Sequence, residues 1–131
     1  MEVDFVTFEI AKKLKEKGFP QVKKNTLAMY NETGEWFSLA RNLDAYEYSF
    51  VDFDDRDCVC PTISQAIKWL RKEKRIDAGA IWSNDDKVWV GYVNDMSMPD
   101  LVSDYILPHN SYDSYEEAAM SAIEYILDNL I

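Results

Sequence analysis

The residues of this chain that could do chemistry are two cysteines, one histidine and a run of acids. Cys58 and Cys60 are separated by a single residue, and the only histidine, His109, lies far from them along the chain. A disulfide between Cys58 and Cys60 would close a small, strained ring. Two thiols cannot by themselves complete a four-ligand structural zinc site. We therefore predict that both cysteines are reduced, hold no metal and lead into the helix that follows.

An enzyme would need these groups to meet in the fold. A single histidine excludes most hydrolytic triads, and a thiol enzyme would have to bring Cys58 or Cys60 to His109. The 4 glycines form no phosphate-binding loop. No calcium-loop pattern of glycine and glutamate surrounds the densest acids, which are Asp52, Asp54, Asp55 and Asp57. The sequence thus predicts no catalytic residue and no cofactor, with a small enzyme using carboxylates or Cys58/Cys60 as an alternative.

Charge is spread unevenly along this acidic chain. The net charge is −10 and the isoelectric point is about 4.5. Such a protein repels the phosphate backbone, which disfavours nucleic acid as a partner. Residues 68–75 are mainly basic, whereas every charged residue after Lys87 is acidic. Single-sign patches of this kind steer association with a partner.

Three amphipathic helices with capping residues must position these groups. They are predicted over 7–17, 62–74 and 114–130, and each begins with a threonine or serine that can cap the first turn. Gly18 and Pro20 are expected to end the first helix. The residues at the centre of the apolar stripes of the second and third helices are predicted to be core: Ile67, Leu70, Ile123 and Ile126.

Aromatic-rich segments between the helices predict strands. A first hairpin joins 26–30 to 35–40, with Gly34 in the left-handed position of its turn. A second hairpin joins 78–83 to 87–93, and further strands are expected at 47–53 and at 101–107. Together these elements predict a single α+β domain over 1–131. In it, three helices pack on one face of an antiparallel sheet built from two hairpins plus one or two extra strands.

The chain carries no signal for a membrane. No apolar run approaches the roughly 18 residues that a spanning helix needs. The first residues are acidic where a secretion signal would be basic. We therefore predict a cytoplasmic protein that does not bind membranes.

Three helical segments resemble a known group of proteins. They read FVTFEIAKKLKEKGF, CPTISQAIKWLRKEKRI and SYEEAAMSAIEYILDNLI. These segments are similar to those of small uncharacterised proteins of gut anaerobes, often encoded in prophages and mobile elements. That group has no established activity and no agreed site residues. The resemblance implies only a cytoplasmic, phage-associated accessory protein.

The function predicted from these observations is non-enzymatic binding of another protein. An alternative is that the acidic surface imitates DNA and inhibits a host DNA-binding protein. The expected contact surface is either the basic face of the second helix or the acids of the last helix. These surfaces consist of Lys68, Arg71, Lys72 and Arg75, and of Glu117, Glu124 and Asp128. The sequence identifies neither the partner nor the oligomeric state.

Overall fold

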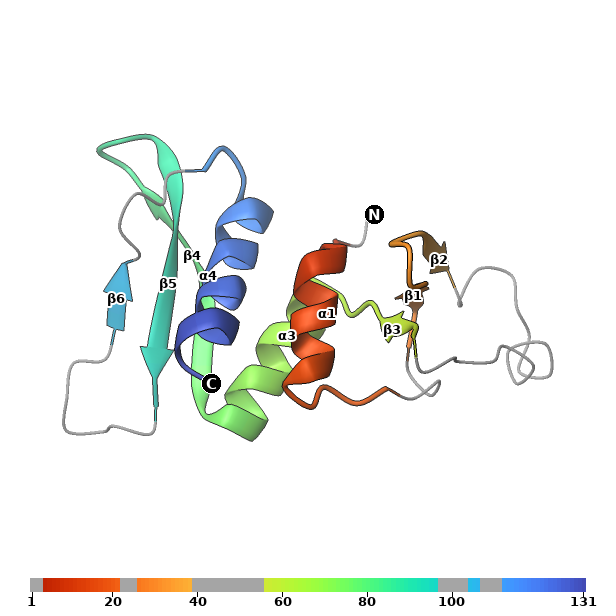
Figure 1. Cartoon of the computed structure of the whole chain (residues 1–131). Helices are drawn as coiled ribbons and strands as arrows, with labels where there is room; N and C mark the ends of the chain where they lie inside the picture. Colours follow the sequence, from red (N-terminus) through yellow and green to blue (C-terminus); the bar gives the residue numbers. More distant parts are fainter. Residues whose placement is uncertain (1–3, 22–25, 39–55, 97–103, 107–111) are drawn as a thin grey trace. The chain divides into compact units, whose positions relative to one another are not determined.

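The computed structural model describes residues 4–21, 26–38, 56–96, 104–106 and 112–131 (Figure 1). The chain divides into two compact units, unit 1 (Met1–Thr62) and unit 2 (Ile63–Ile131). Helices and antiparallel strands in the described residues confirm the α+β class. The strands form two sheets instead of one, because each hairpin pairs with a third strand of its own unit. That residues 1–131 act as a single domain stays a prediction.

The first helix of unit 1, α1 (Phe8–Glu16), begins and ends as predicted. The hydroxyl of Thr7 accepts a hydrogen bond from the backbone amide three residues on, at 3.4 Å. At the other end Gly18 has a φ of +101°. The backbone N–H of Phe19 donates to the carbonyl oxygen of Leu14 at 2.9 Å. This is the glycine-terminated motif that satisfies the last carbonyl groups of a helix.

Three short antiparallel strands form the sheet of unit 1 in the order β2-β1-β3. They are β1 (Ala28–Tyr30), β2 (Trp36–Ser38) and β3 (Cys58–Val59). Tyr30 pairs with Trp36 on one side and with Cys58 on the other. These three side chains therefore share one face of the sheet. The cysteines thus belong to a paired strand and its end, and the strand predicted at 47–53 lies outside the described residues.

The turn between β1 and β2 is the one that the sequence predicts. Gly34 has a φ of +89°, and its N–H donates to the carbonyl oxygen of Asn31 at 3.0 Å. The Asn31 side chain completes the turn, because its Oδ1 accepts from the backbone N–H of Thr33 at 3.0 Å and of Glu35 at 2.9 Å. An asparagine that bonds to the backbone ahead of it is a strong local turn signal.

Replacing Gly34 by alanine should destabilise the chain more than the same change at Gly18. Both glycines have positive φ, where a Cβ costs about 1–2 kcal/mol. At Gly34 the added Cβ would also lie 2.9 Å from Cδ2 of Phe8, whereas at Gly18 it would meet nothing within 4 Å. Urea unfolding of both variants checks this. Equal losses of unfolding free energy would show that Phe8 does not pack tightly on the turn.

The first helix of unit 2, α3 (Ile63–Trp69), continues into a wider turn, η1 (Leu70–Lys74). It ends at Arg75, whose φ is +58° and whose N–H donates to the carbonyl oxygen of Leu70. Leu70 is fully buried, as predicted. Ile67 is only half-buried, because the buried stripe runs through Ile63, Ala66 and Leu70 and leaves Ile67 at its edge.

Three antiparallel strands form the sheet of unit 2 in the order β4-β5-β6. They are β4 (Ile76–Ser83), β5 (Val88–Asp95) and β6 (Asp104–Ile106). The second predicted hairpin is confirmed, since β4 and β5 pair along their whole length. Strand β6 falls within the predicted 101–107. Ala78 and Val93 face each other across the hairpin, and both are buried.

The last helix, α4 (Tyr115–Asn129), packs across β4 and β5 and also contacts α3. The Ser114 hydroxyl caps it by accepting from the N–H of Glu117 at 3.2 Å, as the sequence predicts. Ile123 and Ile126 are fully buried, which confirms them as core. Among the described residues, every helix is too short or too polar to span a lipid bilayer.

Candidate functional site

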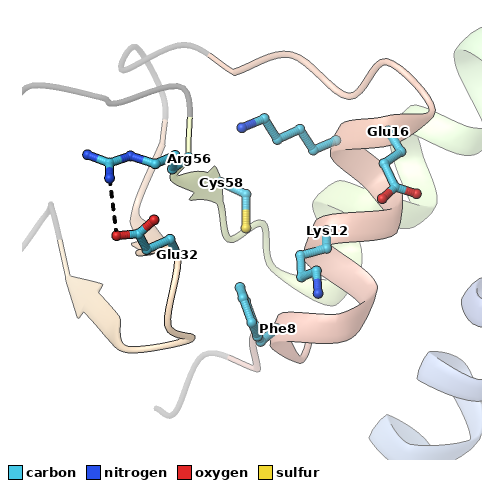
Figure 2. Close-up of a pocket in the computed structure, with 7 residues that line it drawn as sticks. Phe8, Lys12, Glu16, Glu32, Arg56 and Cys58 are labelled. Atoms are coloured by element: carbon cyan, nitrogen blue, oxygen red, sulfur yellow. Dashed lines mark hydrogen bonds and ion pairs between the residues drawn. The ribbon is translucent and has the colours of Figure 1, made fainter.

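Unit 1 contains an open groove of about 500 Å³. Helix α1 forms one wall, and the turn after β1 together with the start of β3 forms the other (Figure 2). The groove is lined by Phe8, Lys12, Lys15, Glu16, Glu32, Arg56 and Cys58. Its volume falls in the range of small-molecule sites. The groove therefore joins charged groups from segments that are distant in sequence.

On the helical wall of the groove, the side chains that line it are spaced about one helical turn apart. Phe8, Lys12 and Glu16 follow each other at intervals of four residues, so they share a helix face. The Lys12 ammonium lies 5.0 Å from the centre of the Phe8 ring, a distance at which a cation is attracted to the ring face. The Phe8 ring in turn packs against the Tyr30 ring at 5.3 Å. The ring beneath Lys12 is thus supported by the sheet.

The opposite wall carries an ion pair. Nη1 of Arg56 lies 3.3 Å from Oε1 of Glu32, and the two side chains are 65% and 52% exposed. A pair this exposed contributes at most about 1 kcal/mol. Between the walls, the ammonium of Lys15 donates to the carbonyl oxygen of Asp57 at 2.6 Å. This bond ties α1 to the residue that precedes β3.

The two cysteines of unit 1 are free and buried. Burial raises the pKa of the Cys58 thiol, against a smaller opposing effect of Lys15. Burial also raises the pKa of Cys60 to about 11, and its sulfur lies 3.5 Å from the carbonyl oxygen of Val6. That oxygen also accepts the hydrogen bond of the Tyr30 hydroxyl at 2.8 Å. Since the thiolate is the reactive form, this environment favours packing over nucleophilic chemistry.

The groups considered for catalysis or metal binding do not converge in the described residues. His109, Asp52, Asp54 and Asp55 lie outside them. Within the described ranges no three side chains of the metal-binding types gather in one place.

The predicted basic face lies at the end of α3 and on η1. Its four residues are all exposed: Lys68, Arg71, Lys72 and Arg75. Nη1 of Arg71 lies 3.6 Å from Oδ1 of Asp77 at the start of β4, so one of the four charges is partly balanced within unit 2.

The predicted acids of α4 are spread along the helix. Glu117 is exposed in the first turn, whereas Asp128 is exposed near the last residue. At a rise of about 1.5 Å per residue, roughly 16 Å of helix axis separates them. Glu124 lies between them and is half-buried. These three acids therefore form a line, and only Glu117 lies near the start of the helix.

An exposed aromatic cluster lies at that start. The Trp82 and Trp89 rings meet edge to face at 5.4 Å, and Trp89 meets Tyr115 in the same way at 5.5 Å. The Trp82 side chain is 43% exposed and Tyr115 is 40% exposed. Trp89 is also paired with Tyr112 through two backbone hydrogen bonds of 2.8 Å. We call Trp82, Trp89 and Tyr115 the aromatic cluster of unit 2.

Acids are close sequence neighbours of these rings, both in the hairpin turn and at the start of α4. The Nε1 of Trp82 donates to Oδ1 of Asn84 at 3.2 Å, and the hairpin turn continues with two aspartates. Along the chain, Asp113 precedes Tyr115, and two glutamates follow it. Lys87 is the single basic residue within 82–89 and 112–117. We call these flanking acids the acidic rim: Asp85, Asp86, Asp113, Glu116 and Glu117.

Sequence reasoning placed Trp82 and Trp89 on opposite arms of a hairpin but missed the cluster. Tyr115 is 40% exposed and lies at the edge of the α4 packing. The pairing of Trp89 with Tyr112 brings α4 to the hairpin, and no local pattern indicates that pairing. The groove residues were missed for the same reason.

Compared with known protein families, curated proteins and solved structures, the chain has no match. The resemblance of its three helical segments to small proteins of gut anaerobes stays a prediction.

Proposed function

We propose that this chain is a protein-binding module and that it binds a basic segment of its partner through the aromatic cluster of unit 2. The observation that supports this is an exposed pair of rings, Trp82 and Tyr115, each held by edge-to-face contact with Trp89. Tryptophan and tyrosine are enriched among the residues that dominate binding energy in interfaces. Rings held by ring contacts lose little conformational freedom when a partner binds.

The acidic rim determines the kind of partner. Five acids and a single base, Lys87, flank the rings within 82–89 and 112–117. Lysine and arginine side chains can stack on exposed aromatic faces and pair with acids at the same time. An acidic partner would be repelled. A segment that combines arginine with apolar residues therefore fits this surface best.

The imitation of DNA remains the alternative function. It would use acids along the whole of α4, including Glu124 and Asp128, and would have no need for the rings. Changing these two acids to amides therefore separates the two proposals. We expect binding through the aromatic cluster to be nearly unchanged by that double change.

The binding test uses a synthetic peptide of alternating arginine and leucine, with a glutamate-for-arginine peptide as its counterpart. The chain has 4 tryptophans, so nitrogen-15 NMR can follow each indole N–H. At low salt we expect the basic peptide to shift the signals of Trp82 and Trp89, and the acidic peptide to shift neither. The affinity should fall as salt is added, because four of the five rim acids are exposed and therefore screened.

Changing Trp82 and Tyr115 together to alanine should weaken binding of the basic peptide at least about tenfold. The matched control is Trp36→Ala in unit 1, because Trp36 is 45% exposed and Trp82 is 43% exposed. This control should leave the affinity unchanged. Absence of binding at millimolar basic peptide, or equal losses in both variants, would overturn the proposed function.

A further inference from the structure

We infer that the groove of unit 1 is a binding site for a small organic carboxylate with an apolar body. The groove has a volume of about 500 Å³ and mixes aromatic, thiol and charged lining. Sites for metabolite-sized ligands combine an apolar surface with a few polar groups that fix orientation. This inference concerns unit 1 and does not depend on the proposed function of unit 2.

The lining offers cations to an anionic ligand. Three of its side chains are cationic, Lys12, Lys15 and Arg56, and two are acidic, Glu16 and Glu32. The carboxylate of Asp57 also acts on Cys58. The Lys12 ammonium lies over the Phe8 ring. In the described part of the chain it forms no ion pair. It is therefore the group best placed to meet a ligand carboxylate.

An apolar surface lies beside that cation. The Phe8 ring is held from behind by Tyr30, and the Cys58 thiol lies toward the centre of the groove in Figure 2. Burial raises the pKa of this thiol, so at neutral pH it presents a neutral, polarizable surface. An aromatic or aliphatic ligand body can pack between Phe8 and Cys58 while its carboxylate meets Lys12.

Glu32 acts as an internal competitor of such a ligand. Its carboxylate already occupies the guanidinium of Arg56, at 3.3 Å. Because both side chains are more than half exposed, water screens the pair and a ligand carboxylate can replace Glu32. Removing the charge of Glu32 should therefore strengthen binding, which is the opposite of what loss of a ligand-binding residue would do.

Titration of the full chain with 3-phenylpropionate tests the inference, with 3-phenylpropanol and 3-phenylpropylamine as neutral and cationic analogues. Calorimetry gives the affinities, and nitrogen-15 NMR locates the binding. We expect the carboxylate to shift the backbone signals of Phe8, Lys12 and Cys58 and to bind at least about tenfold more tightly than either analogue. Equal affinity of the alcohol or the amine would overturn the proposed charge selectivity.

Three variants locate the site. Lys12→Gln should weaken binding of 3-phenylpropionate about fivefold or more, and Glu32→Gln should strengthen it about two- to fivefold. Lys13→Gln, next on α1 but outside the groove lining, is the matched control and should change nothing. Equal weakening by the two lysine variants would mean that the anion is held only by the general charge of α1, which overturns the inference. The double change of Trp82 and Tyr115 to alanine should leave this titration unchanged. The proposal for unit 2 and the inference for unit 1 are therefore tested independently.

Discussion

Replacing Ile123 by alanine should lower the free energy of unfolding by about 2–5 kcal/mol. Ile123 is fully buried in α4, the helix that packs across β4 and β5. Alanine would remove buried methyl groups and leave a cavity that the surrounding side chains can only partly fill. Urea unfolding followed by circular dichroism measures the loss. A loss of this size is a large fraction of the total stability of a small protein.

The control for this change is Ile67→Ala on α3. The sequence places Ile67 and Ile123 alike at the centre of an apolar stripe, but the structure leaves Ile67 half-buried. The same deletion at Ile67 removes atoms that already meet water, so its cost should be clearly smaller. Equal losses of unfolding free energy in the two variants would contradict the half-buried position of Ile67 and would show that it belongs to the core.

The local elements of this fold could be predicted from the sequence. Thr7, Gly18 and Ser114 mark helix ends because each cap is made within a few residues of the chain. Gly34 marks its turn for the same reason, since positive φ is readily adopted only without a Cβ. The pairing of β4 with β5 could also be predicted, because two aromatic-rich segments are joined by a short turn. These signals need no knowledge of distant residues.

Long-range pairing could not be predicted in this way. Strand β3 contains Cys58, which pairs with Tyr30. This strand has only two residues, which is too short for an alternation of polar and apolar side chains to be recognised in the sequence. The division of the strands between two sheets depends on which strand each hairpin recruits. Register between distant segments is decided by tertiary packing and not by local propensity.

The candidate sites depend on the same distant pairings. Three acids of the last helix, Glu117, Glu124 and Asp128, were predicted from the sequence as a contact surface. Only Glu117 falls in the acidic rim, because α4 carries the other two away along its axis. The groove needs α1 to meet Arg56 and Glu32. No spacing rule links residues that lie so far apart.

Replacing Leu14 by alanine should destabilise the whole chain, not only unit 1. Leu14 is fully buried on α1, so the cost should again be about 2–5 kcal/mol. Thr62 pairs with Phe5 in unit 1, and α3 of unit 2 begins at the next residue. With no linker at this boundary, and with small units only marginally stable alone, we expect one cooperative transition.

The measurement compares Leu14→Ala with Ile123→Ala in urea, using two probes. Trp36 reports on unit 1, and Trp82 with Trp89 reports on unit 2, each followed through its indole signal by NMR. Each variant should move the transitions seen by both probes to the same lower urea concentration, which is the behaviour of a single domain. If Leu14→Ala moves only the Trp36 transition and Ile123→Ala only that of Trp82 and Trp89, the two units unfold independently, and the prediction of a single domain over 1–131 is wrong.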